Sequence, residues 1–292
     1  MRPLSSVGLT VSKVILITGC RSGIGLALAK AAGQAGYTVY AGLRDITTKA
    51  DLVRETEGFS VHPVQLDVTK PNERDAIVNT IVETHGRLDI LINNAAIGIG
   101  GFLEEMTESE MRWVLDVNVI GAWALTKACI PSLRDAKGSV LMISSLSGQM
   151  GVPGLGSYCM SKFALEGLSE AWRHELAVFD INLTLIQPGA YKTAMTGPHR
   201  KFTAHAGTVH PQYNRLNQTL IKWYDKTAVA RAYPPSHLAE RVIKILQHPN
   251  PKVRYAIGPS TGWRRIILKW LPFSVVEWYF RRVLSRPLEE KR

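Results

Sequence analysis

The feature that most constrains the fold is a short apolar run leading directly into a glycine-rich turn. Residues 13–18 (KVILIT) are apolar and β-branched, as expected for a strand buried on both faces of a parallel sheet. Residues 19–25 (GCRSGIG) follow at once, and a helical pattern then runs to Gly36. Glycines between a strand and a helix let the backbone approach a pyrophosphate, whose charge meets the helix N-terminus. Such a turn can also be only a tight turn, but its placement favours dinucleotide binding.

Further apolar, β-rich runs recur along the chain and alternate with helical patterns. They cover residues 37–43, 61–66, 89–93, 138–145, 181–186 and 254–257. The pattern predicts an α/β fold: a single Rossmann-type doubly wound parallel sheet of about seven strands with helices on both faces. Ligands of such sheets bind beyond the carboxyl ends of the strands. A single site is expected there, because six candidate residues follow strands: Gly19, Arg44, Asp67, Asn94, Ser145 and Pro188.

We expect one dehydrogenase-sized domain over residues 13–261, after a lead of residues 1–12, because no Pro- or Ser-rich linker divides the 292 residues. Residues 192–235 form an insert expected to cover the substrate. Residues 262–292 are expected to form a basic, amphipathic, helical C-terminal extension. Cys20, Cys129 and Cys159 are scattered, which suits a reducing compartment and argues against a disulfide framework or a zinc site.

The net charge of +11 comes from two segments. Residues 192–231 contribute +6 and residues 262–292 contribute +5, while the remainder holds 20 basic and 20 acidic residues. No nucleic-acid-binding motif accompanies the charge, so we expect no nucleic-acid partner. The first residues lack the apolar run of a signal peptide, and no uninterrupted apolar stretch reaches the length of a membrane span. A cytoplasmic protein is expected. The histidines of the insert lie in a loop-like, solvated segment, and no metal site is expected: His199, His205 and His210.

Tyr158 and Lys162 are the strongest candidates for chemistry. They stand four residues apart in a run that predicts a long helix, which places them on one helix face. A nearby cation favours the ionised form of a phenol, so Tyr158 is a candidate proton donor or acceptor. Ser145, at the end of another predicted strand, is expected to hydrogen-bond a substrate oxygen beside the phenol. Tyr-x-x-x-Lys alone is common on helix surfaces, and only the nucleotide site in the same chain makes it significant.

The cofactor preference is expected to depend on the end of the second predicted strand. An acidic residue there holds the ribose hydroxyls of NAD, whereas an arginine suits the 2′-phosphate of NADP. Arg44 occupies that place, although Asp45 follows it directly. We therefore expect NADP(H), with NAD(H) as the alternative. Asp67 is expected to border the adenine or to cap a turn. Thr107–Glu110 predicts a capping box that starts a long helix through Cys129.

Taken together, these motifs resemble those of the short-chain dehydrogenase/reductase family over residues 13–260. The segments LDVNVIG, GVPGLGSYCMSKFALEG and VYAGLRD are similar in sequence to those of the 17β-hydroxysteroid and retinol dehydrogenase branch of the family. The motifs that carry the resemblance are TGxxxGIG (residues 18–25), NNA (93–95), Asn118, Ser145, Tyr158 with Lys162, Pro188–Gly189 and Thr193. Ala96 departs from the glycine that the family usually has there, which adds a methyl to the cofactor pocket.

The resemblance implies roles for these residues. Tyr158 is the acid/base, Lys162 lowers its pKa and holds the nicotinamide ribose, and Ser145 orients the substrate oxygen. Asn118 positions a relay water, although periodicity alone favours a structural bridge for this buried residue. The implied cofactor-binding residues are Gly19, Arg21, Ser22, Gly23, Ile24, Gly25, Arg44, Asp67, Val68, Asn94, Ala95, Ala96, Tyr158, Lys162, Pro188, Gly189 and Thr193. A homo-dimer or homo-tetramer is also expected.

The resemblance implies an NADP(H)-dependent oxidoreductase that interconverts a hydrophobic alcohol and its ketone or aldehyde. Apolar and aromatic residues of the insert suggest a steroid-, retinoid- or lipid-like substrate: Met195, Phe202, Tyr213, Leu216, Leu220, Trp223 and Tyr224. The alternatives are a catalytically silent dinucleotide-binding sensor or scaffold, and a membrane-surface protein acting through its basic tail. In that tail, residues 262–271 and 275–283 each carry an apolar helical stripe with arginines between. This pattern favours either an anionic membrane surface or packing against the pocket or a second subunit.

Overall fold

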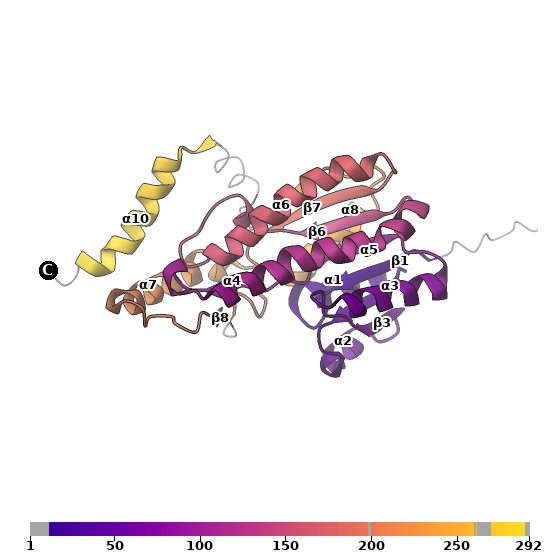
Figure 1. The fold of residues 1–292 in the computed structure, drawn as a ribbon, viewed down its shortest axis with the longest axis horizontal. Coiled ribbons are helices and arrows are strands. Elements are labelled where there is room, and N and C mark those ends of the chain that lie inside the picture. The colour runs from indigo at the N-terminus through magenta and orange to yellow at the C-terminus, as the bar shows by residue number, and fades with distance from the viewer. Residues whose placement is uncertain (1–11, 198–199, 260, 262–269, 290–292) are drawn as a thin grey trace, which may run out of the picture.

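A parallel sheet of seven strands forms the centre of the protein. The structure is a computed structural model that describes residues 12–197, 200–259, 261 and 270–289. The strand order is β3-β2-β1-β4-β6-β7-β9 (Figure 1). All seven predicted strands are present, and the predicted fold class is confirmed. The strands are β1 (Val14–Thr18), β2 (Thr38–Leu43), β3 (Val61–Gln65), β4 (Ile90–Asn93), β6 (Ser139–Ile143), β7 (Asn182–Pro188) and β9 (Arg254–Ile257).

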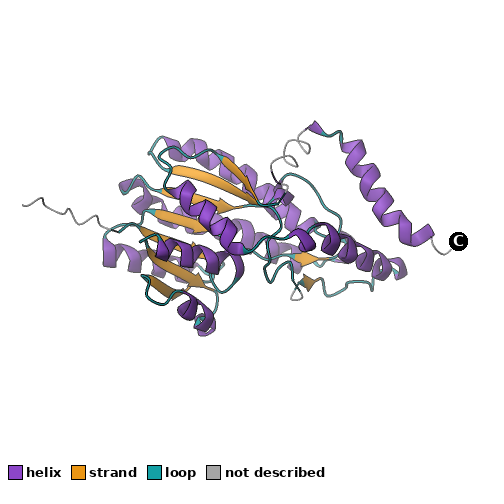
Figure 2. Cartoon of the chain, turned by 180° about the vertical axis from the view of Figure 1, so that it is seen from behind, coloured by secondary structure: helices purple, strands orange, loops and turns teal. Residues whose placement is uncertain are grey.

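Helices cover both faces of this sheet (Figures 1 and 2). One face carries α1 (Gly23–Gln34), α2 (Ala50–Glu55) and α8 (Pro235–Leu246), and the other carries α3 (Pro71–His85), α5 (Ala122–Asp135) and α6 (Gly156–Ala177). The residues of β1 explain this arrangement, because side chains alternate between the faces of a strand. Val14 and Leu16 join the core beneath α3, α5 and α6, whereas Ile15 and Ile17 join the core beneath α1 and α8.

The long helix predicted after Thr107 is also present, with a π-helical turn in its middle. It consists of α4 (Glu108–Leu115), the π turn η3 (Asp116–Gly121) and α5. The predicted capping box is confirmed: Thr107 accepts from the Glu110 N–H, and the Glu110 carboxylate accepts from the Thr107 N–H. The run Glu108–Asp135 is long and apolar enough, by length and composition, to cross a membrane. Its buried side chains, among them Val114, Leu125 and Leu133, explain that composition as part of the core.

The insert contains two elements that the sequence did not predict. Strand β8 (Lys201–Phe202) pairs in parallel with β5 (Ile99–Gly100), and helix α7 (Pro211–Thr227) follows. Two-residue strands are too short to show a period. Residue His210, placed in a solvated loop by the sequence, begins α7 as its N-cap and accepts from the Gln212 N–H.

Glu105 fastens the insert to the body of the protein. This carboxylate is 1% exposed and accepts hydrogen bonds from the Asn217 amide on α7 (3.0 Å), the Gly207 N–H and the Phe102 N–H. A buried carboxylate is stable only when such donors surround it. A buried acid more than 100 residues away in sequence therefore helps to hold α7 in position.

The C-terminal extension packs on α7. Helix α10 (Phe273–Glu289) buries Phe280 in a T-shaped contact with Trp223, at 5.5 Å between ring centroids, and the Trp223 indole N–H donates to the Tyr279 hydroxyl (2.8 Å). The packing alternative left open by the sequence is therefore observed for this helix. Most of the first predicted stripe, residues 262–269, lies outside the described residues.

Glu105→Gln should destabilise the protein by about 1–3 kcal/mol, because a neutral amide leaves buried donors poorly satisfied. Urea unfolding of the full chain measures this change. Glu108→Gln is the matched control: its carboxylate is exposed and pairs only with Arg112, so the free energy of unfolding should change by less than about 0.5 kcal/mol. Equal stability of both variants and the wild type would contradict the fastening role of Glu105.

Candidate active site

The glycine-rich turn after β1 is built against the end of β4. Gly19 has φ of +73°, and a Cβ there would lie 2.9 Å from the Cα of Ala95; a Cβ on Gly25 would lie 2.1 Å from the Gly19 carbonyl. The Asn94 amide donates to the carbonyls of Thr18 (2.8 Å) and Gly19 (3.2 Å). Glycine is therefore required at both positions, and Asn94 holds the turn in place.

The turn presents an open helix N-terminus to the cavity. Ser22, the N-cap of the 12-residue helix α1, makes no side-chain capping hydrogen bond, and the first turn of α1 contains no acidic residue. The N–H groups and positive dipole of α1 are thus left to a ligand, and residues 21–25 line the cavity. An uncompensated helix N-terminus beside close-packed glycines fits a pyrophosphate.

Two arginines lie at the far end of this region. Arg21 and Arg44 line the cavity. The carboxylate of Asp45 accepts from the N–H (3.0 Å) and hydroxyl (2.6 Å) of Thr47, and these bonds, aided by the charges of Arg21 and Arg44, hold the pKa of Asp45 below its usual range. The acid next to Arg44 is therefore engaged in its own turn.

Asp67 also caps a turn, as one of the two interpretations from sequence predicted. Its carboxylate accepts from the N–H (2.9 Å) and hydroxyl (2.7 Å) of Thr69. Asp67 and Val68 both line the cavity, so the cap and the predicted position beside the ligand are compatible. Thr193 lies at the opposite wall, with its methyl 3.2 Å from the position of a Cβ on Gly23.

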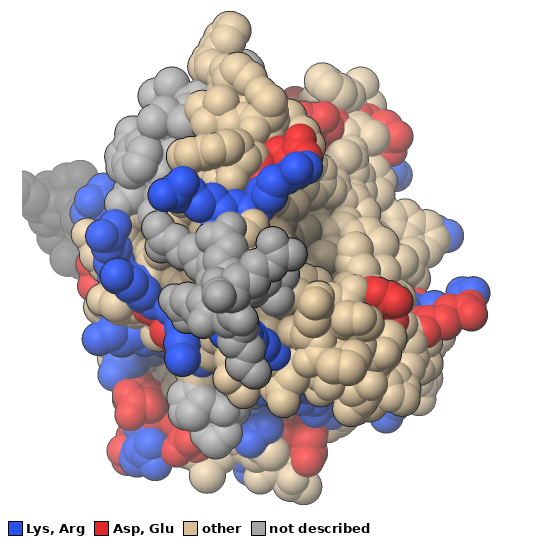
Figure 3. Space-filling view, turned by 90° about the vertical axis from the view of Figure 1, so that its left-hand side faces the viewer, with Lys and Arg blue, Asp and Glu red and all other residues tan. Residues whose placement is uncertain are grey.

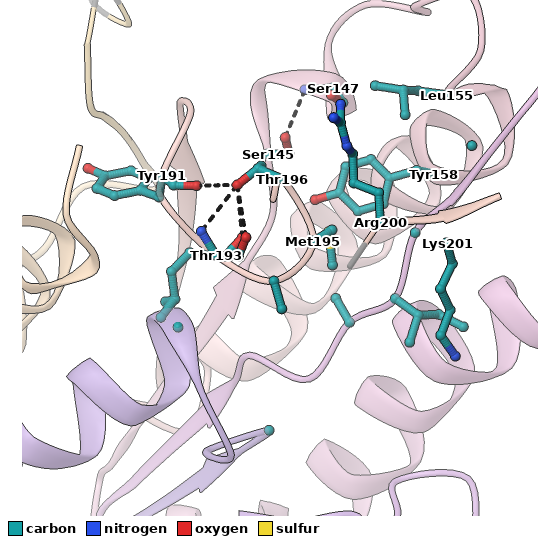
Figure 4. Close-up of a pocket in the computed structure, with 18 of the residues that line it drawn as sticks. Ser145, Ser147, Leu155, Tyr158, Tyr191, Thr193, Met195, Thr196, Arg200 and Lys201 are labelled. Atoms are coloured by element: carbon teal, nitrogen blue, oxygen red, sulfur yellow. Dashed lines mark hydrogen bonds between the residues drawn. The ribbon is translucent and has the colours of Figure 1, made fainter. Parts of the chain in front are cut away.

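Ser145 and Tyr158 meet at the other end of the cavity. Ser145 follows β6, and its hydroxyl accepts from the Ser147 N–H (3.1 Å), while Tyr158 lies in the first turn of α6 (Figure 4). Burial raises the pKa of Tyr158, and its hydrogen bond with Ser145 offsets only part of that rise. The phenol therefore keeps its proton at neutral pH.

Lys162 is buried beneath Tyr158 and does not bond its hydroxyl. Its ammonium donates to the Ile143 carbonyl (2.8 Å) and lies 5.6 Å from the centroid of the Tyr158 ring. Burial lowers the pKa of Lys162 to about 8, and the charge of Glu166 opposes this change. Desolvation of the phenol dominates, so the net direction of the Tyr158 pKa is upward although Lys162 lies beneath the ring.

Asn118 connects two elements beneath the site. Its Oδ1 accepts from the Ile97 N–H (2.8 Å), and its Nδ2 donates to the Ile97 carbonyl (2.8 Å) and the Ser161 hydroxyl (2.9 Å). These bonds match the structural bridge that periodicity favours. Asn118 does not line the cavity, whereas every other predicted catalytic or cofactor-binding residue does.

One cavity of about 480 Å³ joins the glycine-rich turn to the insert. Of the seven insert residues proposed from sequence to meet the substrate, Met195, Phe202, Leu220, Trp223 and Tyr224 line it, whereas Tyr213 and Leu216 do not. Tyr213 instead stacks on Phe102 at 4.6 Å between ring centroids. The substrate end is therefore largely apolar and aromatic.

Several residues that line the cavity were not predicted from the sequence, including Ser147, Leu155, Arg200 and Asn217. Arg200 lies beside the cavity with Tyr158 and Met195 (Figure 4) and pairs with Asp225 at 2.9 Å. Arg200 stands in a mainly polar stretch (TGPHRKFT), which gives no signal that its side chain reaches the cavity. Leu155 and Asn217 offered none, because only tertiary packing brings their loop and helix to the cavity.

Comparison with known proteins agrees with this geometry. Residues 13–204 match the model of the short chain dehydrogenase family. A 3-ketodihydrosphingosine reductase of Bacteroides thetaiotaomicron is 34% identical over 92% of this chain and 97% of its own length. The human 17-beta-hydroxysteroid dehydrogenase type 1 is 34% identical over 83% and 76%, and a mouse retinol dehydrogenase is similar as well. The predicted resemblance is confirmed.

A solved structure extends the comparison to the cofactor. The alcohol dehydrogenase of the archaeon Thermococcus sibiricus, complexed with 5-hydroxy-NADP, superposes with a TM-score of 0.68 at 25% identity, covering 86% of this chain and 97% of that one. The open N-terminus of α1 and the glycine-rich turn fit the same class of ligand. This chain therefore belongs to the short-chain dehydrogenase family and is an oxidoreductase that uses a nicotinamide dinucleotide and acts on CH–OH groups.

Proposed function

We propose that this protein uses NADP(H) to interconvert a hydrophobic alcohol and its ketone or aldehyde, with Tyr158 as acid/base. The observation that carries the proposal is that Ser145 and Tyr158 line the same cavity as the glycine-rich turn. A carbonyl oxygen placed between two hydroxyl groups accepts hydrogen bonds from both. The bound dinucleotide would supply or accept the hydride.

The protonated state of Tyr158 supports proton donation. Because burial raises the pKa of Tyr158, the phenol at neutral pH can deliver a proton to a carbonyl oxygen that becomes negative as it is reduced. The charged Lys162 beneath the ring stabilises the phenolate left behind. Ser145 holds the substrate oxygen beside the phenol. A silent sensor or scaffold would need none of these three groups.

The walls of the cavity support a bulky apolar substrate. Phe202, Leu220 and Trp223 line it together with Met195 and Tyr224. Apolar walls with a few placed polar groups are the usual composition of a site that binds a large hydrophobic ligand. A steroid-, retinoid- or long-chain lipid-like alcohol or ketone fits this chemistry.

Tyr158→Phe should lower kcat by at least about 100-fold while leaving NADPH affinity within about twofold of wild type, since it removes only the transferable proton. A panel of hydrophobic ketones, followed by NADPH fluorescence, measures both quantities. Tyr213→Phe is the control, because its hydroxyl bonds Glu104 outside the cavity. Turnover of Tyr158→Phe equal to that of wild type would remove the acid/base role.

We propose NADP(H) as the preferred cofactor because of Arg44 and Arg21. Asp45, the neighbouring residue that would suit the ribose hydroxyls of NAD, is held by Thr47. Both guanidinium groups lie at the cavity, and charge-assisted bonds from arginine to a phosphate are strong and geometrically specific.

Arg44→Ala should lower the ratio of kcat/KM for NADPH to that for NADH by about 10–100-fold, because it removes a cation that only the 2′-phosphate uses. Arg54→Ala, an exposed arginine on α2 that pairs with Asp51, should leave the ratio unchanged. A ratio that stays constant in Arg44→Ala would show that Arg44 does not select the cofactor.

We also propose that α10 binds an anionic membrane surface in the plane of the bilayer. Phe280 packs on α7, but Phe273 and Trp278 are 78% and 60% exposed. The Arg282 guanidinium lies 5.9 Å from the Trp278 ring. Figure 3 looks onto this end of the molecule and shows a broad uncharged surface with Lys and Arg gathered on one side and a few acidic side chains on the other. Exposed aromatics beside arginines on one helix suit an anionic lipid surface.

Phe273→Glu/Trp278→Glu should abolish flotation of the protein with anionic liposomes at low salt, because two carboxylates oppose insertion and repel the lipid. The helix keeps Phe280, so its packing on α7 is preserved. Val53→Glu, a similar change on exposed α2, should float like wild type. If the wild type remains at the bottom of the gradient, surface binding by α10 is wrong.

A further inference from the structure

A second carboxylate lies beneath the candidate catalytic groups. Glu166 stands one helical turn after Lys162 on α6, as Lys162 stands one turn after Tyr158. Only 8% of Glu166 is exposed, and it does not line the cavity. The loop after Ser145 closes over it: a Cβ on Gly148 would lie 3.0 Å from the Glu166 Cγ. No substrate or cofactor reaches this acid, so any role it has is exerted through its neighbours.

Two donors from neighbouring strands fix the Glu166 carboxylate. Its Oε1 accepts from the Gln187 amide on β7 (3.0 Å), and its Oε2 accepts from the Arg254 Nε on β9 (2.8 Å). Arg254 also donates to Glu170 (2.6 Å), one turn further along α6 and more exposed. Positive and negative groups therefore alternate from Arg254 through Glu166 to Lys162.

Lys162 needs such a carboxylate. The residue is 2% exposed, and its ammonium donates a hydrogen bond to a neutral carbonyl, that of Ile143. A buried ammonium without a negative charge nearby tends to lose its proton. Of the titratable groups nearby, Glu166 acts on Lys162 directly, Tyr224 and Cys159 act on Tyr158, and Arg254 lies beyond Glu166. Glu166 is the negative charge among them.

We propose that Glu166 is a positioning residue that keeps Lys162 protonated at neutral pH, with Gln187 and Arg254 holding its carboxylate in place. This inference rests on the proposed function for its effect on turnover, but the charge state of Lys162 is independent of it. When Lys162 carries its charge, the phenolate formed at Tyr158 is stabilised. When the charge is lost, that stabilisation is lost as well.

The direct test is the titration of Lys162 in the full chain labelled with ¹³C at lysine Cε. The Lys162 signal is identified by its absence in Lys162→Arg. Burial lowers the Lys162 pKa to about 8 in the wild type, and Glu166→Gln should lower the midpoint by about one further pH unit, because one opposite charge is removed. A midpoint within about 0.2 units of wild type overturns the proposal.

The kinetic test uses the same variants. The positive charge of Lys162 is present below its pKa and is lost as the pH rises through that pKa. The alkaline limb of the pH profile of kcat/KM for carbonyl reduction should therefore move about one pH unit lower in Glu166→Gln. At pH 6 the variant should stay within about threefold of wild type. Glu170→Gln, which loses the same arginine contact without a charge near Lys162, should keep the wild-type limb.

Glu166→Asp separates charge from packing. It retains the carboxylate, so its Lys162 midpoint should lie closer to wild type than that of Glu166→Gln, and NADPH fluorescence reports that each variant is folded. Equal shifts in the two variants would assign the effect to packing and overturn the proposal. A normal Lys162 shift in a protein that reduces none of the tested ketones would instead overturn the proposed function alone.

Discussion

Burial of the sheet on both faces is the constraint on which the rest of the structure depends. The central strands expose almost no side chain, so most of their residues are apolar and the polar groups of the site lie just beyond the strand ends. Parallel strands bring all their carboxyl ends to one edge, and Gly19, Asn94 and Ser145 follow β1, β4 and β6 there. The site is therefore a consequence of strand direction: residues up to 126 positions apart meet because their strands end together.

The two ends of the cavity differ in how they are made rigid. At the cofactor end, close packing of the backbone makes the site rigid, because the glycine turn touches Ala95 and Asn94. At the substrate end, side-chain contacts hold the wall, because the buried Glu105 bonds α7 and α10 packs against Trp223. A turn packed this closely tolerates few substitutions, whereas a wall held by a few side chains can vary with the ligand. The family match over residues 13–204 includes the whole dinucleotide end and stops within the insert, before α7.

The chemistry depends on groups that are costly to bury. A phenol and an ammonium lie in the interior because Ser145, the Ile143 carbonyl and the charge of Glu166 offset part of the desolvation. Their protonation states follow from that balance. The phenol keeps its proton, and the pKa of the ammonium is lowered toward neutral pH. The Glu166 carboxylate in turn accepts a hydrogen bond from Arg254 on β9, the strand at the edge of the sheet.

The sequence by itself determined the seven strands, the glycine turn and the pairing of Tyr158 with Lys162, because these depend on local periodicity and on helical spacing of four. The predicted catalytic and cofactor-binding residues line the cavity except Asn118, whose amide is used in a bridge, whereas Tyr213 and Leu216 of the insert do not reach it. Only the tertiary structure decided the position of α7, the burial of Glu105, the pairing of Glu166 with Arg254 and the direction of the Tyr158 pKa. Each of these depends on contacts between distant segments or on exclusion of water, and a linear pattern carries neither.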